Sequence, residues 1–156
     1  MKSLILYHSE TGHTRRVAEF IHNNTDSEMI ELKPKKTYSK IRILTSGIKK
    51  ALMQQNEDIA VQEIDLSPYD TIVIGTPVWG GHPTPVINAV FEILKDGEGK
   101  EAVAFATFGK SDGDTLSILR KRLEDSGMHV RDTFGFTAKE TEDQTELKKM
   151  IEIAGL

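Results

Sequence analysis

The sequence predicts an α/β protein with three layers (α/β/α), in which helices cover both faces of a five-stranded parallel sheet. Short apolar runs alternate along the chain with longer stretches whose apolar residues recur at helical spacing, which is the pattern of repeated strand–helix–strand units. The run from 71 to 75 is almost wholly apolar, which is typical of a strand buried on both faces. We therefore place that strand at the centre of the sheet.

The elements follow in order along the chain. Strands are predicted at residues 3–7, 29–32, 71–75, 101–107 and 129–137, because each run is short and rich in apolar or β-branched residues. A helix is predicted at residues 14–22, where apolar residues form a stripe. A second helix carries Leu116, Leu119 and Leu123 and stops before Gly127, and the last helix carries the apolar residues between 147 and 154. A further helix is expected to open at Pro83 or Pro85, to include Leu94 and to end at Asp96-Gly97.

The segment between the second and third strands is unusually long and basic. Ile41, Leu44, Ile48, Ala51 and Leu52 lie at helical spacing, so a helix packed on one sheet face is expected. Residues 33–50 contain seven lysines and arginines and no acid, although the whole chain has a net charge of −4. This face is either a docking surface for an acidic partner or a solvated helix surface. We expect a single domain over residues 1–156, with a basic insert at about 33–56.

Composition excludes several classes of function. The 156 residues are 38% hydrophobic and 28% charged, which is typical of a folded domain. The absence of cysteine excludes disulfides, thiolate nucleophiles and cysteine-held metals, so any redox chemistry needs a bound cofactor. Net negative charge argues against a nucleic-acid partner, and the histidine spacing indicates no metal site. No run is long and apolar enough for a signal or membrane segment, so we expect a cytoplasmic protein without a membrane partner.

The loop after the first strand has the residues of a phosphate site. Between Ser9 and Thr14 the chain has three hydroxyls and one glycine, and a helix begins there. Hydroxyls and the free amides of a helix N-terminus donate hydrogen bonds to an anion, and the helix dipole favours it. The Walker and Rossmann glycine patterns are absent, which favours a terminal phosphate monoester. The alternative is that Ser9 and Thr11 only cap the helix.

The loops after the third and fourth strands have the residues of a ring site. Trp79, the only tryptophan, stands between Pro77-Val78 and two glycines, so its flat face is expected to be available for stacking. The alternative is a core tryptophan that anchors the loop. The glycines of the 107–113 loop permit backbone contacts to a ring, although turn formation alone also explains them. Loops after parallel strands share one sheet edge, and neighbouring strands set them across roughly 10 Å, enough for a tricyclic ring with a phosphate tail.

These three segments resemble the flavodoxin family over nearly the whole chain. The resemblance rests on residues 9–14 followed by Val17-Ala18, on residues 72–80, and on Thr107-Phe108-Gly109 leading to Gly113. It implies strand order 2-1-3-4-5, a short-chain form and FMN as cofactor, with phosphate in the first loop. It also implies that Trp79 covers one ring face, that a backbone group of Gly80 or Gly81 meets flavin N5, and that the 107–113 loop contacts the pyrimidine edge. The implied cofactor-binding residues are Ser9, Glu10, Thr11, Gly12, His13, Thr14, Pro77, Val78, Trp79, Gly80, Gly81, Thr107, Phe108, Gly109 and Gly113.

The sequence departs from the family pattern in three places. His13 replaces the usual asparagine, the 107–113 loop lacks the usual stacking tyrosine, and the basic insert is additional. The resemblance implies a low-potential carrier that shuttles single electrons between redox partner proteins, a reductase and an acceptor. In that role no residue acts as acid, base or nucleophile. The alternatives are an FMN-dependent NAD(P)H:quinone or flavin reductase, favoured by the missing tyrosine, and an interaction module without flavin that uses the basic insert.

Overall fold

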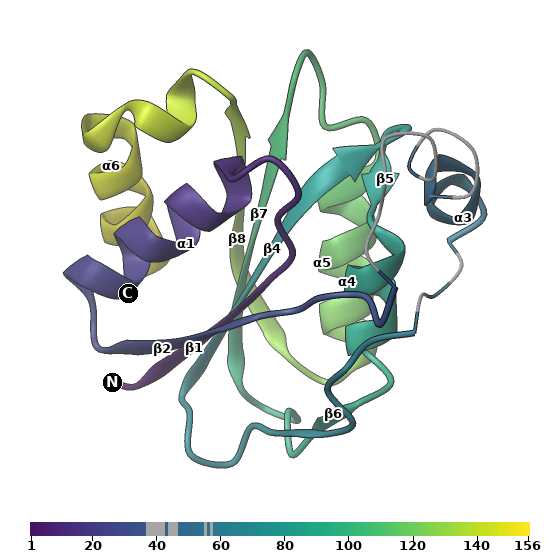
Figure 1. Cartoon of the computed structure of the whole chain (residues 1–156). Coiled ribbons are helices and arrows are strands. Elements are labelled where there is room, and N and C mark those ends of the chain that lie inside the picture. Colours follow the sequence, from purple (N-terminus) through teal and green to yellow (C-terminus); the bar gives the residue numbers. More distant parts are fainter. Residues whose placement is uncertain (37–42, 44–46, 55, 57) are drawn as a thin grey trace.

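A parallel sheet forms the centre of the molecule in the computed structural model (Figure 1), which describes residues 1–36, 43, 47–54, 56 and 58–156. Its strands are β1 (Ser3–Tyr7), β2 (Ser27–Glu31), β4 (Thr71–Trp79), β7 (Glu101–Phe108) and β8 (His129–Thr137), in the order β2-β1-β4-β7-β8. All four pairings along this path are parallel. Counted along the chain this order is 2-1-3-4-5, so the predicted fold class is confirmed.

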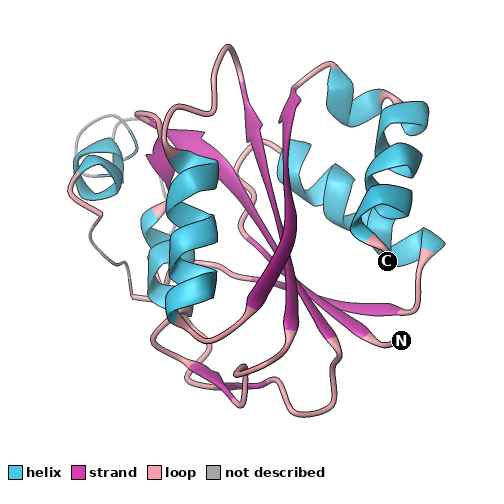
Figure 2. Cartoon of the chain, turned by 180° about the vertical axis from the view of Figure 1, so that it is seen from behind, coloured by secondary structure: helices cyan, strands magenta, loops and turns pink. Residues whose placement is uncertain are grey.

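Helices cover both faces of the sheet. Helices α1 (His13–Asn24) and α6 (Gln144–Ala154) lie on one face, whereas α4 (Pro85–Val90) and α5 (Thr115–Asp125) lie on the other (Figures 1 and 2). A short 3-10 helix, η2 (Glu140–Glu142), precedes α6. Among the described residues, none of the helices is long and apolar enough to cross a membrane.

The core consists of two apolar clusters, one on each side of the sheet, because successive strand side chains point to opposite faces. The cluster under α1 and α6 includes Ile5, Val17, Val73, Phe105 and Met150. The cluster under α4 and α5 includes Leu4, Leu6, Ile72, Ile74, Val86 and Leu119. The strand at 71–75 is buried throughout, as its apolar run predicted.

The predicted helix that was to end at Asp96-Gly97 is shorter than expected. α4 ends at Val90, and Leu94–Lys95 form strand β6, which pairs in parallel with β3 (Ile64–Asp65). The Ile64 amide donates to the Ile93 carbonyl at 2.9 Å, and the Leu66 amide donates to the Lys95 carbonyl at 2.9 Å. These bonds replace a continued helix. Leu94 still packs against the same core cluster, so its helical spacing was misleading.

A hairpin replaces the expected loop after the central strand. β4 continues to Trp79 and pairs antiparallel with β5 (His82–Pro83), which leaves Gly80 and Gly81 as a two-residue turn. Their φ angles are +59° and +78°, the region that type I′ hairpin turns need and that glycine enters without strain.

Part of the predicted helix in the basic insert is confirmed. Helix α3 (Ile48–Leu52) lies beside β5, and Ile48 and Ala51 belong to or pack against the α4-side core cluster (Figure 1). Ile41 and Leu44, which the same prediction included, lie outside the described residues.

Candidate functional site

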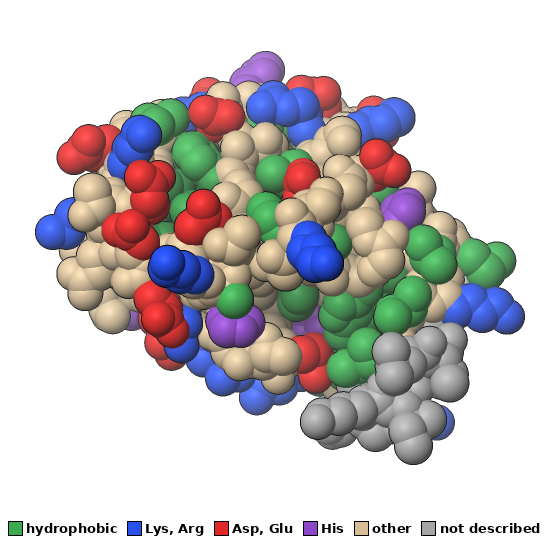
Figure 3. Space-filling view, turned by 90° about the horizontal axis from the view of Figure 1, so that it is seen from above, with side chains coloured by type: hydrophobic (Ala, Val, Ile, Leu, Met, Phe, Trp, Pro, Cys, Tyr) green, Lys and Arg blue, Asp and Glu red, His purple; other side chains and the backbone are tan. Residues whose placement is uncertain are grey.

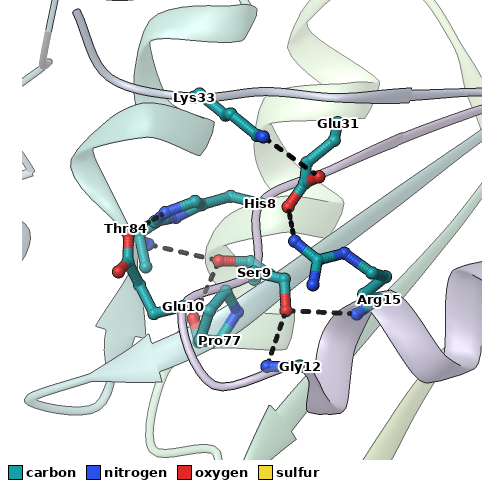
Figure 4. Close-up of polar contacts among 10 residues, drawn as sticks. His8, Ser9, Glu10, Gly12, Arg15, Glu31, Lys33, Pro77 and Thr84 are labelled. Atoms are coloured by element: carbon teal, nitrogen blue, oxygen red, sulfur yellow. Dashed lines mark hydrogen bonds and ion pairs between the residues drawn. The ribbon is translucent and has the colours of Figure 1, made fainter. Parts of the chain in front are cut away.

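The first loop connects the end of β1 to the start of α1. Gly12 precedes the helix with φ +94°, in the left-handed region. Ser9 Oγ accepts hydrogen bonds from the Gly12 amide at 3.2 Å and the Arg15 amide at 3.3 Å (Figure 4). Ser9 therefore caps the first turn, as the alternative reading held. Its O–H and the amides of His13 and Thr14 have no hydrogen-bond partner among the residues that the structure describes, so they remain donors for a ligand.

A hydroxyl pair ties the first loop to the end of β7. Thr14 Oγ1 lies 2.8 Å from Thr107 Oγ1, and both side chains are buried. A threonine hydroxyl can donate one hydrogen bond while it accepts another. The pair thus holds the helix start against the neighbouring strand end and keeps capacity for a further polar contact.

The three predicted loops meet at one cleft of about 280 Å³, at the sheet edge onto which Figure 3 looks. Nine of the predicted residues line it, together with Ala138: Glu10, Thr11, His13, Pro77, Val78, Trp79, Thr107, Phe108 and Gly109. The strand order reverses between β1 and β4, which is where open α/β sheets bind ligands.

The six remaining predicted residues support the cleft without lining it. Ser9, Gly12 and Thr14 belong to the first loop and the helix start. Gly80 and Gly81 form the hairpin turn, and Gly113 lies against it: a Cβ on Gly113 would meet Gly81 Cα at 2.5 Å. The Asp114 amide also donates to the Gly81 carbonyl at 2.8 Å, so the loop after β7 fixes the turn after β4.

Trp79 is more buried than the sequence suggested. It is 8% exposed and packs in the α4-side core cluster, with its ring meeting the His8 ring edge-on at 5.7 Å between centroids. Trp79 is the last residue of β4 and pairs with His82 of β5 in the hairpin. Trp79 thus anchors the core, and part of its surface also forms a wall of the cleft.

Phe108 is held toward β8. A Cβ on Gly135 of β8 would lie 2.8 Å from Phe108 Cε1, so the ring occupies the space that this glycine leaves. Nothing lies within 4 Å of a Cβ built on Gly109. The space beside Gly109 is therefore open among the described residues, in the loop that lacks the family's usual tyrosine.

His13 presents an unused polar atom. The residue lines the cleft, and its Nδ1 is buried with no hydrogen-bond partner among the described residues. Buried polar atoms are nearly always paired, so this nitrogen suits a ligand atom. Together with the Ser9 and Thr11 hydroxyls and the free amides, it makes a donor set that fits a phosphate. Across the described part of the chain, no cluster of three histidines or acids could hold a metal.

A buried histidine beside the first loop was not among the predicted site residues. His8 is 1% exposed; its Nε2 lies 2.7 Å from Glu10 Oε1 and its Nδ1 lies 2.8 Å from Thr84 Oγ1 (Figure 4). A second hollow of about 290 Å³ opens beside it, lined by His8, Ser9, Glu10, Arg15, Glu31, Lys33 and Pro34. The one sequence signal for His8 was its place directly after a strand, at the edge where ligands bind.

Charge pairing shapes that second hollow. Arg15 forms an ion pair with Glu31, and this hydrogen bond raises the pKa of the Arg15 guanidinium above its ordinary value. Lys33 Nζ lies 3.7 Å from the other carboxylate oxygen of Glu31. The two cations therefore share one carboxylate.

Fold and cleft together define a class of protein: a doubly wound α/β protein with a ligand site at its topological switch point. The model of the flavodoxin family matches residues 2–153, so the chain belongs to the flavodoxin family.

Solved structures show the same architecture. A flavoprotein from Lactobacillus acidophilus in complex with FMN is 28% identical, with a TM-score of 0.69 over 95% of this chain and 97% of its own. A provisionally named flavoprotein from Bacteroides uniformis is 24% identical, with a TM-score of 0.80 over 97% of both chains, and shows the fold alone.

One curated relative matches a part of the chain. A provisionally named diflavin flavoprotein, A 5, from Nostoc is 37% identical over 67 residues, which are 42% of this chain. The match spans 12% of that protein's length.

Proposed function

We propose that this chain binds FMN in the cleft and carries single electrons between larger redox proteins. The observation that carries the proposal is the convergence of three separate loops on one cleft, with phosphate donors in the first loop and the apolar walls of Trp79 and Phe108 in the others. Membership of the flavodoxin family and the FMN complex of the Lactobacillus relative support the cofactor.

We assign the two ends of the cofactor from the residues that line the cleft. Thr11, His13 and the amides at the start of α1 would hold the phosphate, which the helix dipole also favours. Trp79, Val78 and Phe108 would border the ring, and the backbone of Gly80 and Gly81 would meet its edge. When bound, FMN supplies a ring that accepts and returns electrons. The apolar walls and the protein's net charge of −4 disfavour added negative charge, which predicts a low potential.

Reconstitution tests the cofactor. Because Trp79 is the only tryptophan and borders the cleft, FMN should quench the protein's fluorescence with 1:1 saturation. A protein that stays unquenched in excess FMN, and is colourless once free FMN has been removed, would instead be an interaction module of this fold.

A reductase is the second candidate, because the cleft is open beside Gly109, where a substrate could stack on the ring. A stepwise reductive titration separates the two functions. Two distinct one-electron steps indicate a carrier, whereas steady NADPH oxidation with a quinone and no partner protein indicates a reductase.

The partner surface is proposed to lie on α3. A Cβ on Gly80 would lie 3.1 Å from Leu52 Cδ2, so α3 packs directly against the hairpin turn. Leu52 and Met53 are 52% and 58% exposed, and Lys49 is exposed next to them. An apolar contact with a basic border matches a redox partner whose own docking face is acidic.

Small charged oxidants test whether this surface is positively charged, and they do so without a partner protein. With Lys49 and Lys50 both changed to Glu, oxidation of the reduced holoprotein by anionic ferricyanide should slow at least about tenfold at about 10 mM salt. Oxidation by cationic cobalt tris(phenanthroline) should accelerate, and both effects should shrink at about 1 M salt. Reversal of the exposed Lys148 and Lys149 on α6 changes the net charge by the same amount, so it is the matched control, and it should change both rates much less. Equal rates for both double variants would refute the docking surface.

A further inference from the structure

The pair formed by His8 and Glu10 lies between two hollows. Glu10 lines both the candidate FMN cleft and the second hollow beside β2. His8 lines the second hollow, and its ring also meets Trp79, a wall of the cleft. The pair therefore connects the cofactor site to a separate solvent-accessible recess.

The hydrogen bonds of His8 suit both of its protonation states. An ionised carboxylate only accepts, so Nε2 donates to Glu10 in either state. When His8 is neutral, Nδ1 accepts from the Thr84 hydroxyl; when it is protonated, Nδ1 donates to the same oxygen. Thr84 precedes α4, yet its side chain makes no capping bond. Its amide donates to Thr76 Oγ1 at 3.2 Å, which fixes its position.

The charged groups near the pair come from the first loop, α1, β2 and the segment after β2. Glu10 faces His8 from the loop, and α1, β2 and the segment after β2 contribute Arg15, Glu31 and Lys33 to the recess. Arg15 and Lys33 are both engaged with Glu31. His13 lines the same cleft as Glu10, and two uncharged side chains, Trp79 of β4 and Thr84 before α4, contact the His8 ring.

We propose that His8 and Glu10 form a proton-binding pair, in which His8 takes up a proton from solvent when negative charge enters the cleft. The inference rests on the proposed function, because the charge is that of the FMN phosphate or of an electron delivered by a reduced partner. A proton on His8 Nδ1 turns the anionic pair into a neutral one, and no covalent bond other than N–H forms or breaks. His8 is a positioning residue, since it acts through Glu10 and Trp79.

Thermodynamic linkage determines the direction in which pH changes FMN affinity. If FMN binding favours protonated His8, protonation must favour FMN binding to the same extent. FMN affinity should therefore fall as pH rises through the range in which His8 loses its proton. One linked proton gives a slope of up to about tenfold in Kd per pH unit.

The first test is the pH profile of FMN affinity, measured by quenching of Trp79 fluorescence from pH 5.5 to 8.5. The second is the number of protons taken up when FMN binds, measured by calorimetry in buffers that differ in their enthalpy of ionisation. His8→Gln should remove one linked proton and flatten the profile relative to the wild type. The FMN phosphate titrates in both proteins, so the difference between the two isolates His8. The exposed His129→Gln is the control and should keep the wild-type profile.

Two further variants locate the proton. Glu10→Gln keeps His8 but removes its anionic partner, so the sloping part of the affinity profile should move to lower pH. This variant tests the inference even if His8→Gln does not fold. Because His13 also meets the phosphate, the comparison is repeated in a His13→Asn background, where His8→Gln should still remove one linked proton. Equal profiles with and without His8 in that background would overturn the inference. Profiles of FMN affinity against pH with the same slope in the wild type and in His8→Gln would also overturn the inference, but would leave the proposed function intact. Failure of the wild type to bind FMN at any pH would overturn both.

Discussion

The contact between Gly113 and Gly81 predicts a strong effect of one added methyl group. In Gly113→Ala the Cβ would lie 2.5 Å from Gly81 Cα and 2.8 Å from its carbonyl oxygen, and both are backbone atoms that cannot rotate away. The φ of +54° adds about 1 to 2 kcal/mol of left-handed strain for alanine. Displacement of the turn adds about 1 to 3 kcal/mol, in the range of overpacked cores, and also strains the hydrogen bond from the Asp114 amide.

We therefore expect Gly113→Ala to lower the free energy of unfolding by about 3 kcal/mol in urea titrations followed by circular dichroism. FMN affinity should fall about tenfold, because the displaced turn borders the ring. Two glycines serve as controls. Gly99→Ala has a φ of +76° and open space, so only strain of about 1 to 2 kcal/mol is expected, and Gly109→Ala has open space without a positive φ and should be nearly neutral. Equal losses for Gly113→Ala and Gly99→Ala would refute the contact argument.

Three further predictions address the site, the core and the pH dependence. His13→Ala should weaken FMN binding about tenfold by removing the donor that Nδ1 offers, whereas His13→Asn should restore most of the affinity; unchanged affinity in the alanine variant would exclude the phosphate contact. Gly75→Ala should destabilise the protein by about 3 kcal/mol in urea, because its Cβ would overlap the Phe105 ring. The added change Phe105→Leu should recover part of the loss if this clash is the cause. The hydrogen bond from Lys2, and a second one from Tyr69, hold the pKa of Glu28 below its ordinary value of 4.5. The ionised Glu28 therefore stabilises the fold at pH values above 4.5, and this stabilisation is lost as the pH falls through the pKa of the folded state. Between about pH 5 and pH 3, the free energy of unfolding of Glu28→Gln should fall less than that of the wild type. The same fall in both proteins would contradict a stabilising role for ionised Glu28.

The alternation of apolar runs with helical spacing predicted the parallel sheet, whereas the strand order came from the resemblance to the flavodoxin family. The five long strands and their helices were found from apolar periodicity, which reports burial directly. Leu94 shows the limit of that signal: its spacing suits a helix, but pairing between β6 and β3 depends on a segment about 30 residues away. Trp79-Gly80-Gly81-His82 carried a hairpin signal, two glycines between extended residues, that was interpreted as a loop.

The cleft could be predicted only as a set of loops. Parallel topology brings strand ends to one edge, so residues around Thr11, Trp79 and Gly109 were expected to meet. The division between residues that line the cleft and residues that support it needed coordinates, because it depends on the Gly81–Gly113 contact. His8 was missed because its role depends on Thr84 and Trp79, which lie more than 70 positions away.

The most direct measurement is a titration of the 15N-labelled apoprotein with FMN, followed by amide chemical shifts. We predict saturation at one FMN per chain, with the largest shifts at residues 9–14, 79–81 and 107–113 and little change in α6. Saturable shifts centred elsewhere, or no saturation, would contradict the claim that these three loops form the FMN site.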